Sequence, residues 1–333
     1  MQPIRQIYFI ITDSCNANCS FCIRKNLTKQ HNLMRLSSAQ KILTELSRVY
    51  CDAVLIVTGG EPTLHPNFIE IINCASSLFQ KVLINTNGSF EDNILNYLQL
   101  KLQGNVYAQI SLDGTKTIHN KLRNTDLFDN VIDKLNQLQP YYKHIALATT
   151  VNPTNYGNIE ELAELLNHYK FSHWKVSWEQ VLNPSSDAFI SYTEWNNLVD
   201  NILHIAKFRV YVGKLFDFDL WDKHIDNINP DTLLSNCGYG YAKFYVDSDF
   251  NVLPCSCTND ILGNLLTDSI EIIDNKLNTI SQIIIPENSV CYNCRYKVIC
   301  NSGCPGYSIK IFGIIGMGDI RCPMVSIKTK ETC

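Results

Sequence analysis

The stretch "IYFIITDSCNANCSFC", residues 7–22, places three cysteines directly after a run of apolar and β-branched residues. The run predicts a buried β-strand, and Thr12 and Asp13 mark where it ends. Cys15, Cys19 and Cys22 follow with the spacing C-x3-C-x2-C, so we expect all three thiols on the loop that leaves this strand. Three crowded thiols in one short loop indicate a metal centre.

The next 170 residues or so alternate apolar runs with helical patterns. The predicted strands are 7–12, 53–58, 81–85, 106–112, 144–151 and 174–181. Helical patterns with apolar residues three and four apart cover 38–50, 67–79, 127–138 and 158–170, and Ser37 with Gln40 predicts a capping box for the first. Six such units mean an α/β protein with a parallel sheet, either doubly wound or a partial (β/α)6 TIM-like barrel. In both folds function collects at the carboxyl ends of the strands, where the three cysteines lie.

Composition excludes several classes of protein. The 333 residues carry a net charge of −4 with Lys and Arg scattered singly, so we expect no nucleic-acid partner. The apolar runs are too short for a membrane helix or a secretion signal, so we expect a soluble, cytoplasmic protein. The 14 cysteines gather in two groups, which favours metal binding over disulfides; Cys51, Cys74 and Cys333 stand apart.

Three thiols, unlike four, leave one iron of a [4Fe–4S] cluster without a protein ligand. An open iron can bind a substrate, and Phe21 would lie against the group that occupies this position. The alternative is a zinc site with His31 as its fourth ligand.

The second predicted strand ends in "TGGEP", residues 58–62, where two glycines allow the backbone to approach a small ligand. Together, "CNANCSFC" and "GGEP" resemble the cluster motif and the methionine-amine motif of the radical S-adenosylmethionine (SAM) superfamily. The resemblance covers roughly residues 5–205 and favours the partial barrel. It implies that SAM binds the open iron, with Gly59, Gly60 and Glu61 meeting its amine.

Other strand ends resemble the same family less specifically. "NTNG" at 85–88 and "SLDG" at 111–114 match patterns found there, and Ser111 and Asp113 would face the ribose or the carboxylate of SAM. The backbone near Val181 would pass along the adenine. For each residue the alternative is an ordinary strand cap or core position, because Asn, Asp and Gly are common in turns.

The last third of the chain holds eight further cysteines, including "CYNCRYKVICNSGC" from Cys291. The spacing resembles the SPASM domain, a cysteine-rich extension of many radical SAM enzymes that binds two auxiliary iron–sulfur clusters. This resemblance implies two ligand sets. The farther cluster would take Cys291, Cys294, Cys300 and Cys322, and the nearer cluster would take Cys237, Cys255 and Cys304. A zinc ribbon is the alternative for these paired cysteines.

Two departures from the SPASM pattern affect the nearer cluster. Phe250 replaces a glycine in the turn before Cys255, so we expect Asp249 or Asn251 to adopt the left-handed conformation. No cysteine precedes Cys237 closely, so the nearer cluster lacks a fourth thiolate. Cys257 would complete it; otherwise the cluster would have an open iron, or Cys257 would act catalytically as a hydrogen donor or proton relay.

These resemblances imply an enzyme with three [4Fe–4S] clusters that cleaves SAM reductively to a 5′-deoxyadenosyl radical and abstracts hydrogen from a substrate carbon. We expect a radical SAM oxidoreductase that modifies a ribosomal peptide by a thioether or C–C crosslink, epimerisation or oxidation. A dehydrogenase of a small sugar-like molecule is the alternative, and a non-catalytic metal-binding scaffold a third. Expected domains are the barrel at 1–205, a linker at 206–236 and the SPASM domain at 237–333. Expected partners are a precursor peptide, an electron donor such as flavodoxin or ferredoxin, and a separate peptide-recognition protein, since little chain precedes the first strand.

Overall fold

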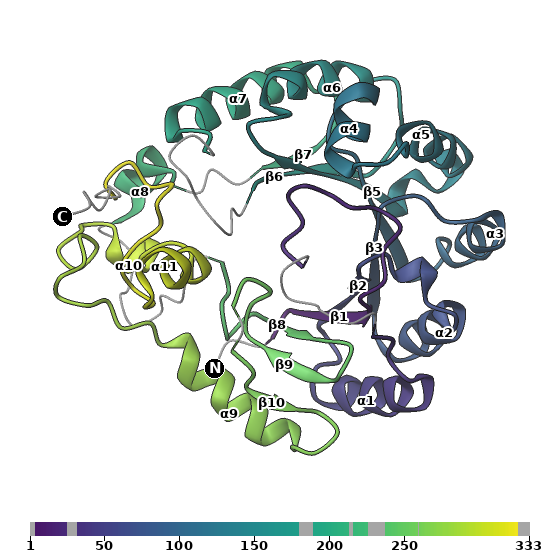
Figure 1. The fold of residues 1–333 in the computed structure, drawn as a ribbon, viewed down its shortest axis with the longest axis horizontal. Coiled ribbons are helices and arrows are strands. Elements are labelled where there is room, and N and C mark those ends of the chain that lie inside the picture. The colour runs from purple at the N-terminus through teal and green to yellow at the C-terminus, as the bar shows by residue number, and fades with distance from the viewer. Residues whose placement is uncertain are drawn as a thin grey trace.

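A curved sheet forms the centre of the molecule, and helices surround it (Figure 1). The computed structural model describes residues 4–24, 32–179, 189–212, 216–225, 237–258 and 260–325. Seven strands lie parallel in chain order: β1 (Gln6–Thr12), β2 (Val54–Gly59), β3 (Lys81–Thr86), β4 (Val106–Ser111), β5 (Ile145–Val151), β6 (His173–Trp178) and β7 (Val210–Val212).

The strand order distinguishes the two folds that the sequence allows. A doubly wound sheet reverses its order at a switch point, whereas each strand here pairs with the next one along the chain. The partial barrel is therefore confirmed. The six strands predicted from the sequence agree with β1 to β6 within two residues, apart from the end of β6, where Val181 lies outside the described residues.

Helices cover the outer face of the sheet: α1 (Leu36–Val49), α2 (Phe68–Leu78), α3 (Asp92–Lys101), α4 (Lys116–Arg123), α5 (Phe128–Gln137), α6 (Ile159–Leu166) and α7 (Tyr192–Ile205). Alternate strand residues such as Ile7, Phe9 and Ile11 point outward into one core with these helices. The predicted capping box at Ser37 is wrong. Leu36 packs against the core, so α1 begins there after Arg35 and Ser37 lies inside its first turn.

The cysteine-rich third of the chain extends the same sheet. It contributes β8 (Lys243–Val246), β9 (Asn251–Leu253) and β10 (Gly263–Asn264), with α8 (Phe218–His224), α9 (Ile270–Ser281), α10 (Lys297–Cys300) and α11 (Pro305–Phe312). Strand β8 pairs parallel with β1, and the rings of Tyr8 and Tyr245 stack with centroids 4.4 Å apart. The SPASM-like region is thereby joined to the barrel through backbone hydrogen bonds.

The turn between β8 and β9 corrects a prediction. Phe250 itself adopts the left-handed conformation, with φ of 66°, in place of Asp249 or Asn251. Its ring is buried in the core, and the Asp247 carboxylate accepts hydrogen bonds from the backbone N–H groups of Asp249 and Asn251. Burial of a large aromatic ring offsets the cost of about 1–2 kcal/mol for an L-residue in this conformation.

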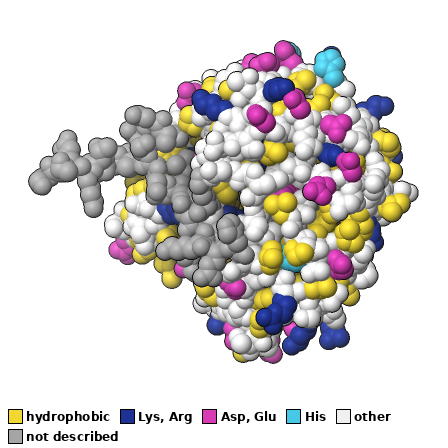
Figure 2. All heavy atoms as spheres, turned by 45° about the vertical axis from the view of Figure 1, so that its right-hand side comes forward, with side chains coloured by type: hydrophobic (Ala, Val, Ile, Leu, Met, Phe, Trp, Pro, Cys, Tyr) yellow, Lys and Arg dark blue, Asp and Glu magenta, His cyan; other side chains and the backbone are white. Residues whose placement is uncertain are grey.

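Charged side chains are dispersed over the surface. Figure 2 shows acidic and basic groups interspersed on the face it displays. Among the described residues, no helix is both long enough and apolar enough to cross a membrane.

Candidate functional site

The loop that carries Cys15, Cys19 and Cys22 is fixed to the barrel by its backbone. The N–H groups of Asn18 and Ser20 donate to carbonyl oxygens at the end of α4, at 3.1 and 3.0 Å. At the other side, the N–H groups of Gly60 and Glu61 donate to the carbonyl oxygens of Thr12 and Ser14 at 2.9 and 2.8 Å. The loop therefore lies across the carboxyl end of the barrel, held between β2 and α4.

The three thiols lie near one another. Burial, with smaller contributions from Glu61, Cys19 and Cys22, raises the pKa of Cys15 to about 11, although the N–H of Ala17 donates to its sulfur at 3.4 Å and lowers it. Protonated thiols must lose their protons to ligate iron, so cluster binding supplies the energy that keeps these thiolates together. Within the described ranges, no three Cys, His, Asp or Glu side chains are arranged around a single metal ion.

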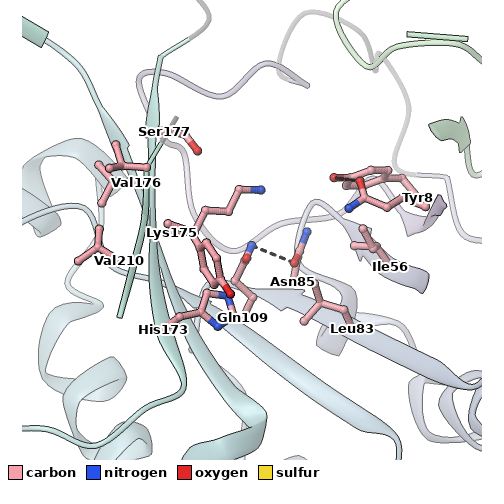
Figure 3. A pocket seen from close by; sticks show the side chains of 13 residues that line it. Tyr8, Ile56, Leu83, Asn85, Gln109, His173, Lys175, Val176, Ser177 and Val210 are labelled. Carbon is pink, nitrogen blue, oxygen red and sulfur yellow. Dashed lines mark hydrogen bonds between the residues drawn. The ribbon is translucent and has the colours of Figure 1, made fainter. Parts of the chain in front are cut away.

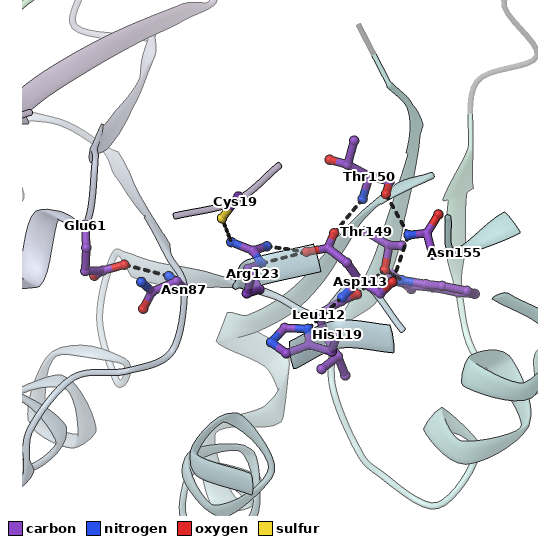
Figure 4. A network of polar contacts seen from close by, with 11 residues as sticks. Cys19, Glu61, Asn87, Leu112, Asp113, His119, Arg123, Thr149, Thr150 and Asn155 are labelled. Carbon is purple, nitrogen blue, oxygen red and sulfur yellow. Dashed lines mark hydrogen bonds and ion pairs between the residues drawn. The ribbon is translucent and has the colours of Figure 1, made fainter. Parts of the chain in front are cut away.

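A buried arginine links this loop to the barrel (Figure 4). Arg123, at the end of α4, donates through Nη1 to the sulfur of Cys19 at 3.6 Å and forms an ion pair with Asp113. Its guanidinium also lies 5.5 Å from the ring centroid of the half-buried Phe21. A fixed positive charge therefore sits beside one of the three sulfurs.

Asp113 differs from the expectation that it faces SAM. It is 1% exposed, one carboxylate oxygen accepts from Arg123, and the other accepts from the N–H of Thr150 at 2.9 Å. His119 accepts from its N–H at 3.1 Å, and Asn155 donates to its carbonyl oxygen at 2.8 Å (Figure 4). Asp113 is thus a buried anchor for Arg123, because every polar group it offers is used inside the protein. Ser111, at the end of β4, is half-buried.

The glycines of the "GGEP" stretch are required by the cysteine loop. A Cβ on Gly59 would lie 2.3 Å from the carbonyl oxygen of Thr12, and one on Gly60 would lie 2.3 Å from that of Ser14. Glu61 is fully buried, and its carboxylate accepts hydrogen bonds from Thr86 at 2.8 Å and from the N–H of Asn87 at 2.6 Å. The motif therefore joins the ends of β2 and β3 to the cysteine loop, in addition to any contact with a ligand.

A second group of thiols lies where the cysteine-rich region meets the barrel. Burial, with smaller contributions from Asp319 and the neighbouring Cys237 and Cys255, raises the pKa of Cys304 to about 12. The N–H of Cys257 donates to the sulfur of Cys255 at 3.3 Å. A Cβ on Gly306 would lie 3.6 Å from the sulfur of Cys304 and 3.9 Å from that of Cys257, so the glycine leaves room for both.

The third group of thiols lines one cavity. Its cysteines are Cys291, Cys294, Cys300 and Cys322, and aromatic side chains of Phe216, Phe218 and Trp221 line the same cavity. Burial raises the pKa of Cys300, and the neighbouring Cys322 and Cys291 raise it further. These are the residues expected from the sequence for the farther cluster, and the structure brings all four together.

The remaining sequence-predicted residues are Phe21, placed above, and Val181 and His31, which both lie outside the described residues. Sequence reasoning missed Arg123, which donates to the sulfur of Cys19, and two polar residues at or just after β6: Lys175, which lines a cavity inside the barrel, and Glu179, whose pKa burial raises. No local signal reveals the pairing of Arg123 with Asp113, ten residues away in the chain. The other two were visible, because polar residues recur at 173, 175, 177 and 179 with the period of a strand.

Comparisons with known proteins agree with this geometry. Residues 9–166 match the Radical SAM superfamily. The sporulation killing factor maturation protein SkfB of Bacillus subtilis (strain 168) is 26% identical over 78% of this chain, which spans 62% of SkfB. The mycofactocin maturase MftC of Mycobacterium tuberculosis (strain CDC 1551 / Oshkosh) is 23% identical over 88% of this chain and 76% of MftC.

Among solved structures, Streptococcus suis SuiB bound to its precursor peptide SuiA superposes with a TM-score of 0.76 at 15% identity, covering 98% of this chain and 77% of SuiB. That similarity concerns the fold. Residues 9–166, which include the cysteine loop after β1, form a radical SAM domain, and the chain has the fold of SPASM-type radical SAM enzymes.

Proposed function

We propose that this radical SAM enzyme modifies a ribosomally made peptide. The observation that carries the proposal is the three-thiol loop at the carboxyl end of the barrel, held between β2 and α4. Two relatives that match most of the chain support a peptide as the substrate class, since one is named a maturation protein and the other a maturase. The product type is left open between a crosslink, an epimer and an oxidised residue.

Cys15, Cys19 and Cys22 would hold a [4Fe–4S] cluster with one iron open to SAM. Such a cluster, once reduced, supplies the cleavage of SAM and the abstraction of hydrogen from an unactivated carbon. Arg123 would stabilise the Cys19 thiolate through the hydrogen bond to its sulfur. Phe21 would shield the open position from water.

The "GGEP" residues remain our proposed contacts for the amine of SAM, but only some of their backbone atoms are available to accept a hydrogen bond from it. An amine donates hydrogen bonds, and the N–H groups of Gly60 and Glu61 already donate to the cysteine loop. The carbonyl oxygens of Gly59 and Gly60 are therefore the acceptors we propose. Ser111 is kept as a proposed contact of the SAM carboxylate or ribose, and the backbone near Val181 as one of the adenine.

The two C-terminal groups of thiols would each hold an auxiliary [4Fe–4S] cluster. For the nearer cluster we propose Cys237, Cys255 and Cys304, with Cys257 as the fourth ligand in preference to a catalytic hydrogen donor. Cys257 is buried, and Gly306 brings it beside Cys304. Replacing Cys257 by Ala is expected to alter the spectrum or iron content of that cluster. A catalytic thiol would instead leave the spectrum unchanged while product formation stops after 5′-deoxyadenosine is made.

Such an enzyme needs a one-electron donor, for which a flavodoxin or ferredoxin is the proposed partner, and a reducing compartment such as the cytoplasm. A separate peptide-recognition protein is a further proposed partner. The test is anaerobic reconstitution with iron and sulfide, followed by reduction with dithionite and SAM. Formation of 5′-deoxyadenosine is expected, and mass spectrometry of a peptide encoded beside the gene should show a changed mass. Turnover of a sugar and of no peptide would replace this proposal by the dehydrogenase, and no 5′-deoxyadenosine at all would leave a metal-binding scaffold.

A further inference from the structure

The inside of the barrel is hollow and polar. On β5 the residues Ile145, Leu147 and Val151 point outward into the core, so the alternate positions Ala146 and Ala148 face inward and fill little space. The space between the strands is a cavity of about 530 Å³ that is open to solvent. Polar side chains from five strands line it: Gln6, Tyr8, Asn85, Gln109, His173, Lys175, Ser177 and Tyr211.

Lys175 projects its ammonium group into this cavity from the middle of β6 (Figure 3). Its neighbours Trp174 and Val176 are buried on the opposite face, whereas Lys175 is exposed to the cavity. The structure gives Lys175 no ion pair or hydrogen bond with any residue in the described ranges. A charged group in the wall of a cavity, without a partner among the described residues, is suited to a charged ligand.

Hydrogen-bond donors accompany the charge. Gln109 donates through Nε2 to Oδ1 of Asn85 at 3.1 Å, which leaves the Nδ2 donor of Asn85 for a ligand (Figure 3). The hydroxyl of Ser177 lines the same cavity on the strand of Lys175. An ammonium, an amide N–H and a hydroxyl together are the donors that a carboxylate accepts well.

Lys81 and Arg209, which act on His173 together with Lys175, carry the same positive charge as Lys175. His173 lies on the same row of β6, and its pKa is lowered by burial and then by Lys81, Arg209 and Lys175. Glu179, the acidic group farther along that row, has its pKa raised by burial alone. The cavity is therefore electropositive, although the whole chain carries a net charge of −4.

We propose that the barrel cavity binds a carboxylate of the substrate through Lys175, with Asn85 and Ser177 as further donors. The substrate class, a peptide with an acidic side chain or a free C-terminal carboxylate, rests on the function proposed above; the anion site itself does not. Lys175 is a specificity residue in this proposal. It positions the substrate and takes no part in bond breaking.

The first experiment needs no substrate and uses glutarate as the probe, with the uncharged glutaramide as its match. The reconstituted protein is briefly acetylated under anaerobic conditions, and acetylation of each lysine is measured by peptide mass spectrometry. Glutarate should slow acetylation of Lys175 about tenfold at saturation, as expected for a charge-assisted hydrogen bond. Glutaramide should have no effect, and Lys41, an exposed lysine on α1, should react equally throughout. Equal acetylation of Lys175 with and without glutarate would overturn the anion site.

The second experiment separates the substrate from SAM. Lys175→Met should form 5′-deoxyadenosine without peptide at the wild-type rate and raise KM for the peptide about tenfold, while Lys175→Arg restores it. Peptides with single Glu→Gln or Asp→Asn changes, and a peptide with an amidated C-terminus, then identify which carboxylate is bound. Loss of 5′-deoxyadenosine in Lys175→Met without peptide would assign Lys175 to SAM and overturn the proposal. A wild-type protein that makes none refutes the proposed function and leaves the acetylation result as the test of this site.

Discussion

Arg123 joins the chemistry of one sulfur to the stability of the barrel. It is 8% exposed, pairs with the 1% exposed Asp113 and reaches the sulfur of Cys19. Breaking a buried ion pair from one side leaves an uncompensated charge, at a cost of about 3–5 kcal/mol. Arg123→Met should therefore lower the free energy of unfolding by about this amount, measured by denaturant titration of the anaerobic protein.

The same helix offers a matched control. Lys116 pairs with Asp129 on the surface, with side chains 60% and 70% exposed. Exposed pairs contribute about 0–1 kcal/mol, so Lys116→Met should change stability little. Equal losses in the two variants would show that the buried pair does not stabilise the barrel.

Glu179 predicts a pH dependence of stability. Burial raises its pKa from 4.5 to about 7, so the folded state favours the neutral acid. The resulting stabilisation is full below the unfolded pKa and is lost as the pH rises through about 7, with a total on the order of 3 kcal/mol at most. Glu179→Gln removes this dependence, so the Tm of the variant relative to the wild type should rise between pH 5 and pH 8. Glu271→Gln, on the surface of α9, is the control, and parallel Tm curves for Glu179→Gln and the wild type would refute the prediction.

At the scale of elements, the loop after β1 and the end of β2 depend on each other. A Cβ on Gly60 would lie 2.3 Å from the carbonyl oxygen of Ser14, and backbone cannot yield as a flexible side chain can. Gly60→Ala should displace the cysteine loop, lowering both the iron bound at the catalytic site and the rate of 5′-deoxyadenosine formation by about tenfold, equivalent to about 1.4 kcal/mol within the usual cost of overpacking. Gly157→Ala, where nothing lies within 4 Å of the added Cβ, is the matched control. Normal iron content in Gly60→Ala would refute this dependence.

The elements that the sequence predicts well are those whose pattern depends on burial. β1 to β6 alternate or run apolar, and the predicted strands match them closely because each one faces the helices on one side. Caps and turns were less predictable. Leu36 extends α1 past the Ser37 cap, whereas the capping box of α7, Ser191 with Glu194, was not predicted because it follows residues of no clear pattern.

The site residues also divide into those that the sequence indicates and those that only the folded structure reveals. The resemblance to the SPASM domain grouped Cys291, Cys294, Cys300 and Cys322, and these four residues line one cavity. The internal ion pair of Asp113 could not be predicted, because a family pattern does not tell a ligand contact from an internal ion pair and the partner Arg123 comes from a different element. The cavity position of Lys175 could be seen only in the folded sheet, since the curvature of the partial barrel brings β6 opposite β1 and β3 around one cavity.

At the scale of the whole molecule, one sheet carries both parts of the chain. β8 adds parallel to β1, so the strand that leads to Cys15 is hydrogen-bonded to the strand that leads toward Cys255. The division at 1–205, 206–236 and 237–333 remains a prediction, to be checked by limited proteolysis. The two parts share a sheet, so neither can be removed without disturbing the other. The iron of each cluster is therefore counted by replacing the cysteines that hold it while the rest of the chain stays folded.

The last prediction counts iron. Three cubanes require about twelve irons per chain, and the loop at Cys15, Cys19 and Cys22 would hold about four of them. Its position depends on backbone hydrogen bonds to α4 and β2, so replacing all three cysteines by Ala should leave the fold and about eight irons while 5′-deoxyadenosine formation is abolished. Cys51→Ala, at an exposed cysteine outside the three groups, is the control and should keep all twelve. Iron analysis and SAM cleavage are measured on the same anaerobic samples. Undiminished cleavage in the triple variant would remove the catalytic cluster from this loop, and zinc in place of the remaining iron would replace the auxiliary clusters by zinc sites.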